Sequence, residues 1–210
     1  MKKYEAIFLI NFTEKIIIPF EDALIKIDYC YEVPILLDMG LQKLILANVF
    51  IYYAMQKFSD VLKRVLKNEL LFHESITKDI GYFYNEYSCN EPLHDREKFV
   101  EVNANGRSFW VGYEYYLWSS CLRDSSCATW IYNDVDGDIV FEVTPLYVAC
   151  DPQEQNYVSY EEWIKNYKPF LIKKISKEVV QQWLDQANFI VEQIDNNVAR
   201  WKQEEIGEME

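Results

Sequence analysis

The stretch IYNDVDGDIVFEVTP, residues 131–145, decides the fold class, because apolar and polar side chains alternate on both sides of an Asp-Gly pair. Alternation with a period of two is typical of half-buried strands, and Asp-Gly favours a two-residue type I′ turn. The stretch therefore predicts a hairpin that turns at Asp136 and Gly137 and sets Tyr132 opposite Phe141. In this register one face is apolar and consists of Trp130, Tyr132, Ile139, Phe141 and Val143, and the other consists of Thr129, Asn133, Asp138, Glu142 and Thr144.

Aspartates occupy alternate positions around the glycine of this stretch, which is also the pattern of a calcium-binding loop. A helix–loop–helix calcium site carries acids at its first, third and fifth positions, glycine at the sixth and glutamate at the twelfth. With Gly137 at the sixth position, the first would be Tyr132 and the twelfth Val143. Both terminal ligands are missing, so we expect a turn here and no metal site.

A second hairpin is predicted upstream, in EKFVEVNANGRSFWVGYEYYLW, residues 97–118. Its turn falls at Asn105 and Gly106, the favoured pair for a type I′ turn. Pairing about this turn sets Val102 opposite Phe109.

The first half of the chain adds strands and a helix. Residues 4–10 and 15–19 are rich in Ile and Phe and predict two strands, or one strand and a buried extended segment. From Leu41 the apolar residues recur every three or four positions, which predicts an amphipathic helix over residues 41–69. Residues 74–96 are polar and rich in Tyr, and we expect an irregular segment or a long loop there.

The final third is predicted to be helical. Ser159 and Glu162 have the spacing of a capping box. Ser176 is expected to cap a long helix over residues 176–201.

Together these elements predict an α+β fold. We expect one antiparallel sheet, built from the two central hairpins and the N-terminal strands and covered by the two long helices. A single domain over residues 1–203 is expected, followed by an acidic tail at residues 204–210.

The charge of the chain restricts the partners. Lys and Arg number 21 against 34 Asp and Glu, which gives a formal net charge of −13. Such a surface repels phosphate backbones and anionic lipid, so we expect neither a nucleic acid nor a membrane as partner. No signal peptide is recognised, and the five cysteines form neither a disulfide framework nor a zinc pattern. We therefore expect reduced thiols in a cytoplasm.

No motif for catalysis, metal binding or cofactor binding is found, and we expect no cofactor. The two histidines, His73 and His94, belong to no recognised spacing. A Cys–His site could join Cys89 or Cys121 to His94 only if the fold brought them together. One alternative to a toxin-binding protein is an enzyme of unknown class, for example one that acts on carbohydrate through Glu114 or Glu142 in aromatic strands. A second alternative is a scaffold or regulatory subunit.

Tyrosine is abundant, with 16 residues, and much of it lies beside acids. Tyrosine supplies contact area and a hydrogen-bonding tip at low entropic cost, and acids attract a basic partner. We therefore expect a basic protein partner, and we make no prediction of the oligomeric state. The residues expected to contact the partner are Tyr84, Glu86, Tyr87, Asp134, Asp136, Asp138, Glu154, Tyr157, Glu161 and Glu162.

The run YYLWSS…ATWIYNDVDGDIVFEVTPLY, residues 115–147, resembles stretches of small bacterial proteins, some of them immunity proteins encoded beside polymorphic or contact-dependent toxins. Immunity proteins vary in fold, are commonly acidic and cytoplasmic, and carry no catalytic residues. The resemblance implies that this chain neutralises a cognate toxin, such as a basic nuclease, by covering its active site. It implies no particular contact residues, because the class shares none.

Overall fold

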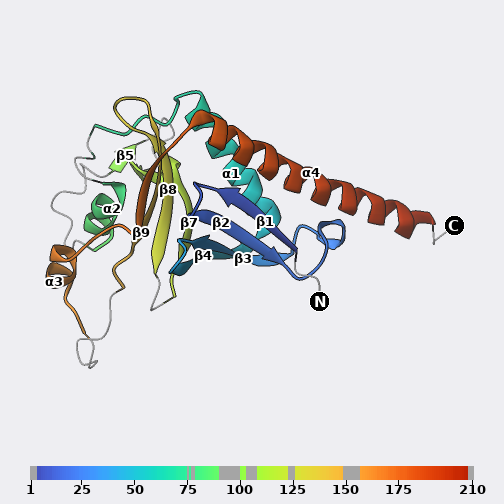
Figure 1. Cartoon of the computed structure of the whole chain (residues 1–210), viewed down its shortest axis with the longest axis horizontal. Helices are drawn as coiled ribbons and strands as arrows, with labels where there is room; N and C mark the ends of the chain where they lie inside the picture. Colours follow the sequence, from blue (N-terminus) through green and yellow to red (C-terminus); the bar gives the residue numbers. More distant parts are fainter. Residues whose placement is uncertain are drawn as a thin grey trace. The chain divides into compact units, whose positions relative to one another are not determined.

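The computed structural model describes residues 4–74, 76, 79–89, 100–102, 108–122, 126–148 and 157–207 (Figure 1). The chain divides into two compact units. Unit 1 combines Met1–Lys67 with Ile175–Glu210, and unit 2 is Asn68–Lys174. The elements are those of an α+β fold, as predicted. The single domain over residues 1–203 stays a prediction.

Unit 1 contains a four-stranded antiparallel sheet in the order β1-β2-β3-β4. The two N-terminal strands are confirmed. The third strand tolerates Pro34 because β2 pairs with β3 only from Leu36 to Asp38, so the proline lies outside that pairing. The bounds are Tyr4–Leu9 for β1, Lys15–Phe20 for β2, Glu32–Asp38 for β3 and Lys43–Phe50 for β4.

The helix predicted over residues 41–69 is wrong in its first part. Residues Lys43–Phe50 form β4, and helix α1 covers only Ile51–Leu66. A tight turn precedes β4, with Gly40 at φ 82° and its N–H donated to Asp38 Oδ1 at 2.9 Å. Apolar residues recur at helical spacing through both β4 and α1, but pairing with β3 makes the first part a strand.

Helices α1 and α4 lie against one face of this sheet (Figure 1). Helix α4, Lys177–Gly207, begins as predicted, because Ser176 Oγ accepts the N–H of Val179 at 3.4 Å. Phe58 of α1 meets Trp183 of α4, with ring centroids 5.9 Å apart. The short 3-10 helix η1, Leu24–Lys26, is tied to α4 by Asn197.

Unit 2 contains a separate four-stranded sheet in the order β10-β9-β8-β7 and a two-stranded ribbon of β5 and β6. The prediction that both hairpins join the N-terminal strands in one sheet is therefore wrong. The bounds are Ile80–Cys89 for α2, Val100–Val102 for β5, Ser108–Trp110 for β6, Tyr113–Tyr115 for the 3-10 helix η3, Tyr116–Ser120 for β7, Cys127–Asn133 for β8, Ile139–Pro145 for β9, Tyr160–Lys165 for α3 and Leu171–Ile175 for β10.

The hairpin of β8 and β9 exists, but its predicted register is wrong by one residue. Tyr132 pairs with Val140, and Trp130 pairs with Glu142. The turn is longer than the type I′ turn predicted: Asp134 N–H donates to the Asp138 carbonyl at 2.9 Å, leaving three residues between them. Gly137, at φ 81°, supplies the left-handed residue that ends such a turn.

Compared with the predicted register, the observed one places each side chain of β9 on the opposite face of the sheet relative to β8. Glu142 shares its face with Trp130 and Tyr132, instead of lying on an outer, solvated face. All seven residues of β8 are buried, and so is β9 from Ile139 to Thr144. The strand pair is therefore covered on both faces.

The register predicted for the upstream hairpin, within residues 97–118, is also wrong by one residue. Val102 pairs with Ser108, not with Phe109. The predicted turn at Asn105 and Gly106 lies outside the described residues.

The long loop predicted over residues 74–96 is wrong for its central part, which forms α2. Asp79 begins this helix, because its carboxylate accepts the N–H of Tyr82 at 2.7 Å and its carbonyl accepts that of Phe83. The cap predicted for α3 is confirmed, since Ser159 Oγ accepts the N–H of Glu162 at 3.3 Å. Within the described part of the chain, no helix has the length and apolar character required to cross a bilayer.

Candidate functional site

Nine of the ten residues predicted to contact a partner are described, and they fall into two regions toward opposite ends of strand β9. The three aspartates lie in the β8–β9 turn, at the start of the strand. The predicted residues on and near α2 and α3 lie toward the C-terminal end of β9. There Asn85 of α2 accepts the N–H of Tyr147, two residues after the strand ends, at 2.8 Å. Glu154 lies outside the described residues.

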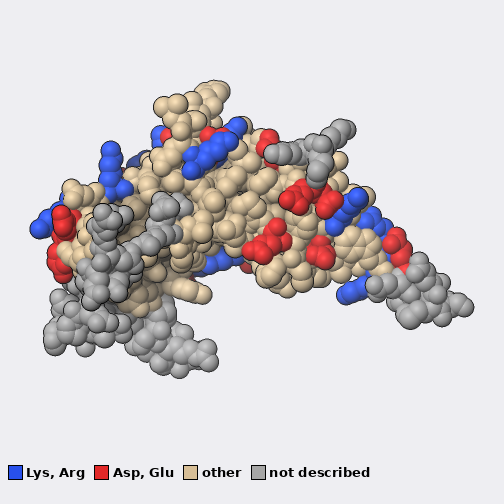
Figure 2. All heavy atoms as spheres, turned by 90° about the horizontal axis from the view of Figure 1, so that it is seen from below, with Lys and Arg blue, Asp and Glu red and all other residues tan. Residues whose placement is uncertain are grey.

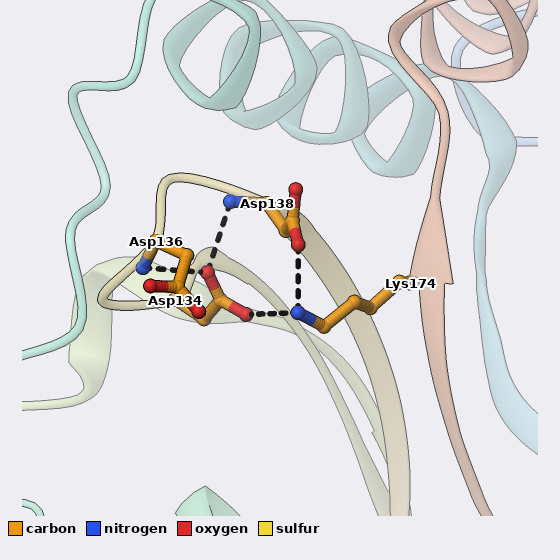
Figure 3. A network of polar contacts seen from close by, with 4 residues as sticks. All are labelled: Asp134, Asp136, Asp138 and Lys174. Atoms are coloured by element: carbon orange, nitrogen blue, oxygen red, sulfur yellow. Dashed lines mark hydrogen bonds and ion pairs between the residues drawn. The ribbon is translucent and has the colours of Figure 1, made fainter.

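The turn aspartates form a closed polar network with one lysine (Figure 3). Asp134 Oδ1 accepts the N–H groups of Asp136 and Asp138, at 3.0 and 2.9 Å. Lys174 Nζ lies 2.9 Å from Asp134 Oδ2 and 2.6 Å from Asp138 Oδ2. Lys174, with the turn N–H groups, lowers the pKa of Asp134. The cation of this turn is therefore a lysine, and two of the three acids already have a partner.

The same turn holds the segment that opens unit 2. Asn133 donates its N–H to the Leu70 carbonyl at 2.8 Å, and its side chain accepts the Leu70 N–H at 3.3 Å. Lys174, the last residue of unit 2, is bound to the turn from the other end of the unit. The turn thus ties the first and last segments of unit 2 to its central hairpin, a structural task that accounts for Asp134 and Asp138.

Two of the predicted tyrosines pack within an aromatic cluster. The Tyr84 ring lies 5.0 Å from Trp110 and 5.2 Å from Trp130, and the Tyr87 ring stacks on Trp110 at 6.0 Å. Burial raises the pKa of Tyr84. This face of α2 stabilises the unit and leaves only part of each ring for a partner.

The opposite face of α2 and helix α3 form what we call the α2–α3 surface. Three of its rings are half-buried and contact one another: Tyr147 lies 5.4 Å from Tyr160 and 5.5 Å from Trp163. The ring of Tyr82 contacts Tyr167, 5.6 Å away. The surface consists of Tyr82 and Glu86 from α2, Tyr147 after β9, and Tyr160, Glu161, Glu162 and Trp163 from α3. Exposed Tyr157 lies just before α3.

The α2–α3 surface is acidic. Glu161 and Glu162 are exposed, Glu86 is half-exposed, and Lys165 lies in the last turn of α3. Burial raises the pKa of the Tyr160 hydroxyl, and Cys89, Glu86 and Glu161 add to the rise. Side chains of both α2 and α3 therefore lie close enough to Tyr160 to influence its pKa. On the face drawn in Figure 2, acidic side chains form several groups, and basic side chains lie beside some of them.

Beneath this surface lies a buried carboxyl group that the sequence reasoning placed on the wrong face. Glu142 has no exposed surface. Its Oε1 accepts the N–H of Gly81 at 3.0 Å, and its Oε2 accepts the Tyr132 hydroxyl at 3.0 Å. Burial, followed by the negative charge of Asp79, raises the Glu142 pKa to about 7, although the bonds from Gly81, Tyr132 and Ile80 oppose the rise.

A second carboxyl group, half-buried Asp79, lies beside this buried group. The Tyr167 hydroxyl donates to Asp79 Oδ1 at 2.8 Å and is also hydrogen-bonded to the Thr144 hydroxyl. Burial raises the pKa of Tyr167. Gly81 lies so close to Thr144 that a Cβ at this position would overlap the threonine side chain. The N-terminus of α2 is therefore seated directly on β9.

The alternative of a carbohydrate-active pair does not match these positions. Glu114 lies in the 3-10 helix η3, not in a strand, and is exposed. Glu142 is buried, and both its oxygens are bound by the protein. A sugar cannot reach the Glu142 carboxyl without displacing α2. For the Cys–His alternative, His94 lies outside the described residues.

The sequence reasoning missed Asp79, Tyr132 and Tyr167 as partners of Glu142. One local signal was present: Asp79 precedes IGYFYNEY, and Asp is a preferred N-cap residue. The pairing of Glu142 with Tyr132 depends on the register and had no local signal. Among the described residues, no three His, Cys, Asp or Glu side chains converge as metal ligands.

Comparison with known proteins adds no relative. No protein-family model, no curated protein and no solved structure matches this chain.

Proposed function

We propose that this chain is an immunity protein, which binds a basic bacterial toxin through the α2–α3 surface and blocks it in the cytoplasm. The observation that supports the proposal is the combination of half-exposed Tyr and Trp rings with carboxylates on two adjoining helices. The resemblance of residues 115–147 to immunity proteins suggested the class.

The rings would supply the contact energy. Tyr147, Tyr160 and Trp163 contact one another, so each ring is held in place before a partner arrives. A side chain that is already ordered loses little rotamer entropy on binding, and Tyr and Trp dominate interface hot spots.

The carboxylates would supply attraction and selectivity. A formal net charge of −13 attracts a basic protein over a distance of about one Debye length. A nuclease is the toxin class that suits this field best, because its active site must be positively charged to hold phosphate. Glu86, Glu161 and Glu162 would then occupy positions that the phosphates of the substrate otherwise take.

The test uses the protein encoded beside the gene for this chain. Co-expression of this chain should restore the growth of cells that express that toxin, and the two proteins should form a complex. The triple variant E86Q/E161Q/E162Q should slow association about tenfold at low salt, since steering changes association rates by one to three orders of magnitude.

The matched control is E5Q/E32Q/E192Q, which removes three exposed acids of unit 1. It changes the net charge equally and should slow association much less. Equal slowing by the two triple variants would contradict a role for the α2–α3 surface. Absence of both protection and complex formation would contradict the proposed function.

A further inference from the structure

We propose that Glu142 is a proton-controlled latch for α2, which holds the helix on β9 when its carboxyl is protonated and loosens it on ionisation. Because α2 carries Tyr82 and Glu86, the latch would regulate the α2–α3 surface, and this consequence rests on the proposed function. The latch itself rests on the geometry of unit 2 alone.

Helix α2 is attached to β9 by a small number of polar contacts. Asn85 donates to the Pro145 carbonyl at 3.0 Å and accepts the Tyr147 N–H at 2.8 Å. Glu142 accepts the Gly81 N–H at 3.0 Å. Of these three direct contacts, the one made by Glu142 involves an ionisable group. A further, indirect link passes from Asp79 through the Tyr167 hydroxyl to Thr144 of β9.

The groups that face Glu142 come from three elements. Asp79 begins α2, Tyr132 lies on β8, and Tyr167 follows α3 and bridges to Asp79. The groups with the largest effect on Glu142 are Asp79, Gly81, Tyr132 and Ile80, and none of these four is a cation. Ionisation therefore places a buried negative charge near half-buried Asp79, and none of the groups named here balances it.

Two opposing effects set the charge of Glu142. The N–H groups of Ile80 and Gly81 belong to the first turn of α2, where the helix dipole and unpaired donors favour an anion. Burial and Asp79 disfavour the anion, and they prevail. The group consequently changes charge near neutral pH, where an ordinary glutamate is fully ionised.

The sign of the effect follows from linkage. The pKa of Glu142 is about 7 with α2 docked, against 4.5 for a solvated glutamate. The docked state therefore binds the proton more tightly. The docking of α2 on β9 is therefore strongest below pH 4.5, the pKa of a solvated glutamate. It weakens as the pH rises through about 7, the pKa of Glu142 in the docked state. Between about pH 5 and about pH 8 the docking equilibrium should fall on the order of fiftyfold.

The experiment needs no partner. NMR titration of side-chain carboxyls in the wild-type protein, assigned with the isosteric variant E142Q, should give a Glu142 midpoint near 7. Amide exchange of α2, corrected for the intrinsic pH dependence, should lose protection on the order of fiftyfold from about pH 5 to about pH 8. E142Q should show no such loss, and the exposed-site control E32Q should behave as the wild type.

A Glu142 midpoint near its ordinary value would overturn the proposal, and so would equal pH dependence of α2 exchange in wild type and E142Q. Binding to the toxin then separates the two proposals. If α2 exchange titrates and no basic toxin binds, the latch stands and the proposed function fails. If a toxin binds while α2 exchange does not titrate, the function stands and the latch fails.

Discussion

Two groups of carboxylates in unit 2 show how differently the same chemical group can be used. Asp134 and Asp138 lie in a turn, share the ammonium of Lys174, and Asp134 has a lowered pKa. Glu142, on strand β9 just after this turn, is buried close to Asp79 and has a raised pKa. The difference arises from the cation and from access to water, not from the acid itself. Acidic residues in one short stretch of sequence can therefore stabilise a fold in opposite ranges of pH.

The largest expected effect is the loss of the Glu142 side chain. E142A leaves the Gly81 N–H and the Tyr132 hydroxyl without an acceptor and opens a cavity, so it should lower the free energy of unfolding by about 4 kcal/mol near pH 5. The loss should be smaller near about pH 8, because the wild type then bears the cost of a buried charge. Urea unfolding followed by tryptophan fluorescence measures both values. A loss that grows with pH would contradict the raised pKa of Glu142.

The next effect concerns the close approach of α2 to β9. G81A should destabilise the protein by about 3 kcal/mol, because its Cβ overlaps Thr144 and the helix must move away. The control is G40A, at a glycine with positive φ and open space around the added carbon, for which about 1 kcal/mol is expected. Comparison of the two urea midpoints checks the prediction. Equal losses would show that α2 is not seated as closely as the contact implies.

A smaller effect is expected at the start of α3. S159A removes the oxygen that accepts the Glu162 N–H and should cost about 1 kcal/mol. S159T keeps a hydroxyl at this position and should recover most of the loss. Thermal unfolding of the three proteins is the measurement. If S159T is no better than S159A, the cap contributes nothing.

The smallest effect is expected at the paired aspartates. K174M removes the ammonium but keeps the length of the side chain, and exposed ion pairs contribute little to stability. Its small loss should disappear at about 1 M salt, where such pairs are screened. Because the Asp134 pKa is lowered, the contribution of this pair is present at neutral pH and lost as pH falls through the range of the aspartates. A salt-independent loss in K174M would mean that the lysine stabilises by packing and not by charge.

The local chemistry of the sequence predicted several elements correctly. Ser159 and Ser176 were identified as helix caps because a cap depends on residues only two or three positions away. The strands at the N-terminus and in the β8–β9 hairpin were predicted because their composition and alternation do not depend on distant contacts.

What only the tertiary structure decided was register, face and partner. A one-residue change in the β8–β9 turn, stabilised by Asp134 and Gly137, moved Glu142 from the predicted outer face to the face of Trp130. Sheet pairing converted Lys43–Phe50 from a predicted helix to a strand, since an apolar run can serve either period. The sequence therefore determined which elements form and where they are capped. The burial of Glu142, and therefore its pKa, depends on residues that are far apart in the sequence, such as Asp79, Tyr132 and Tyr167. No local pattern connects these residues.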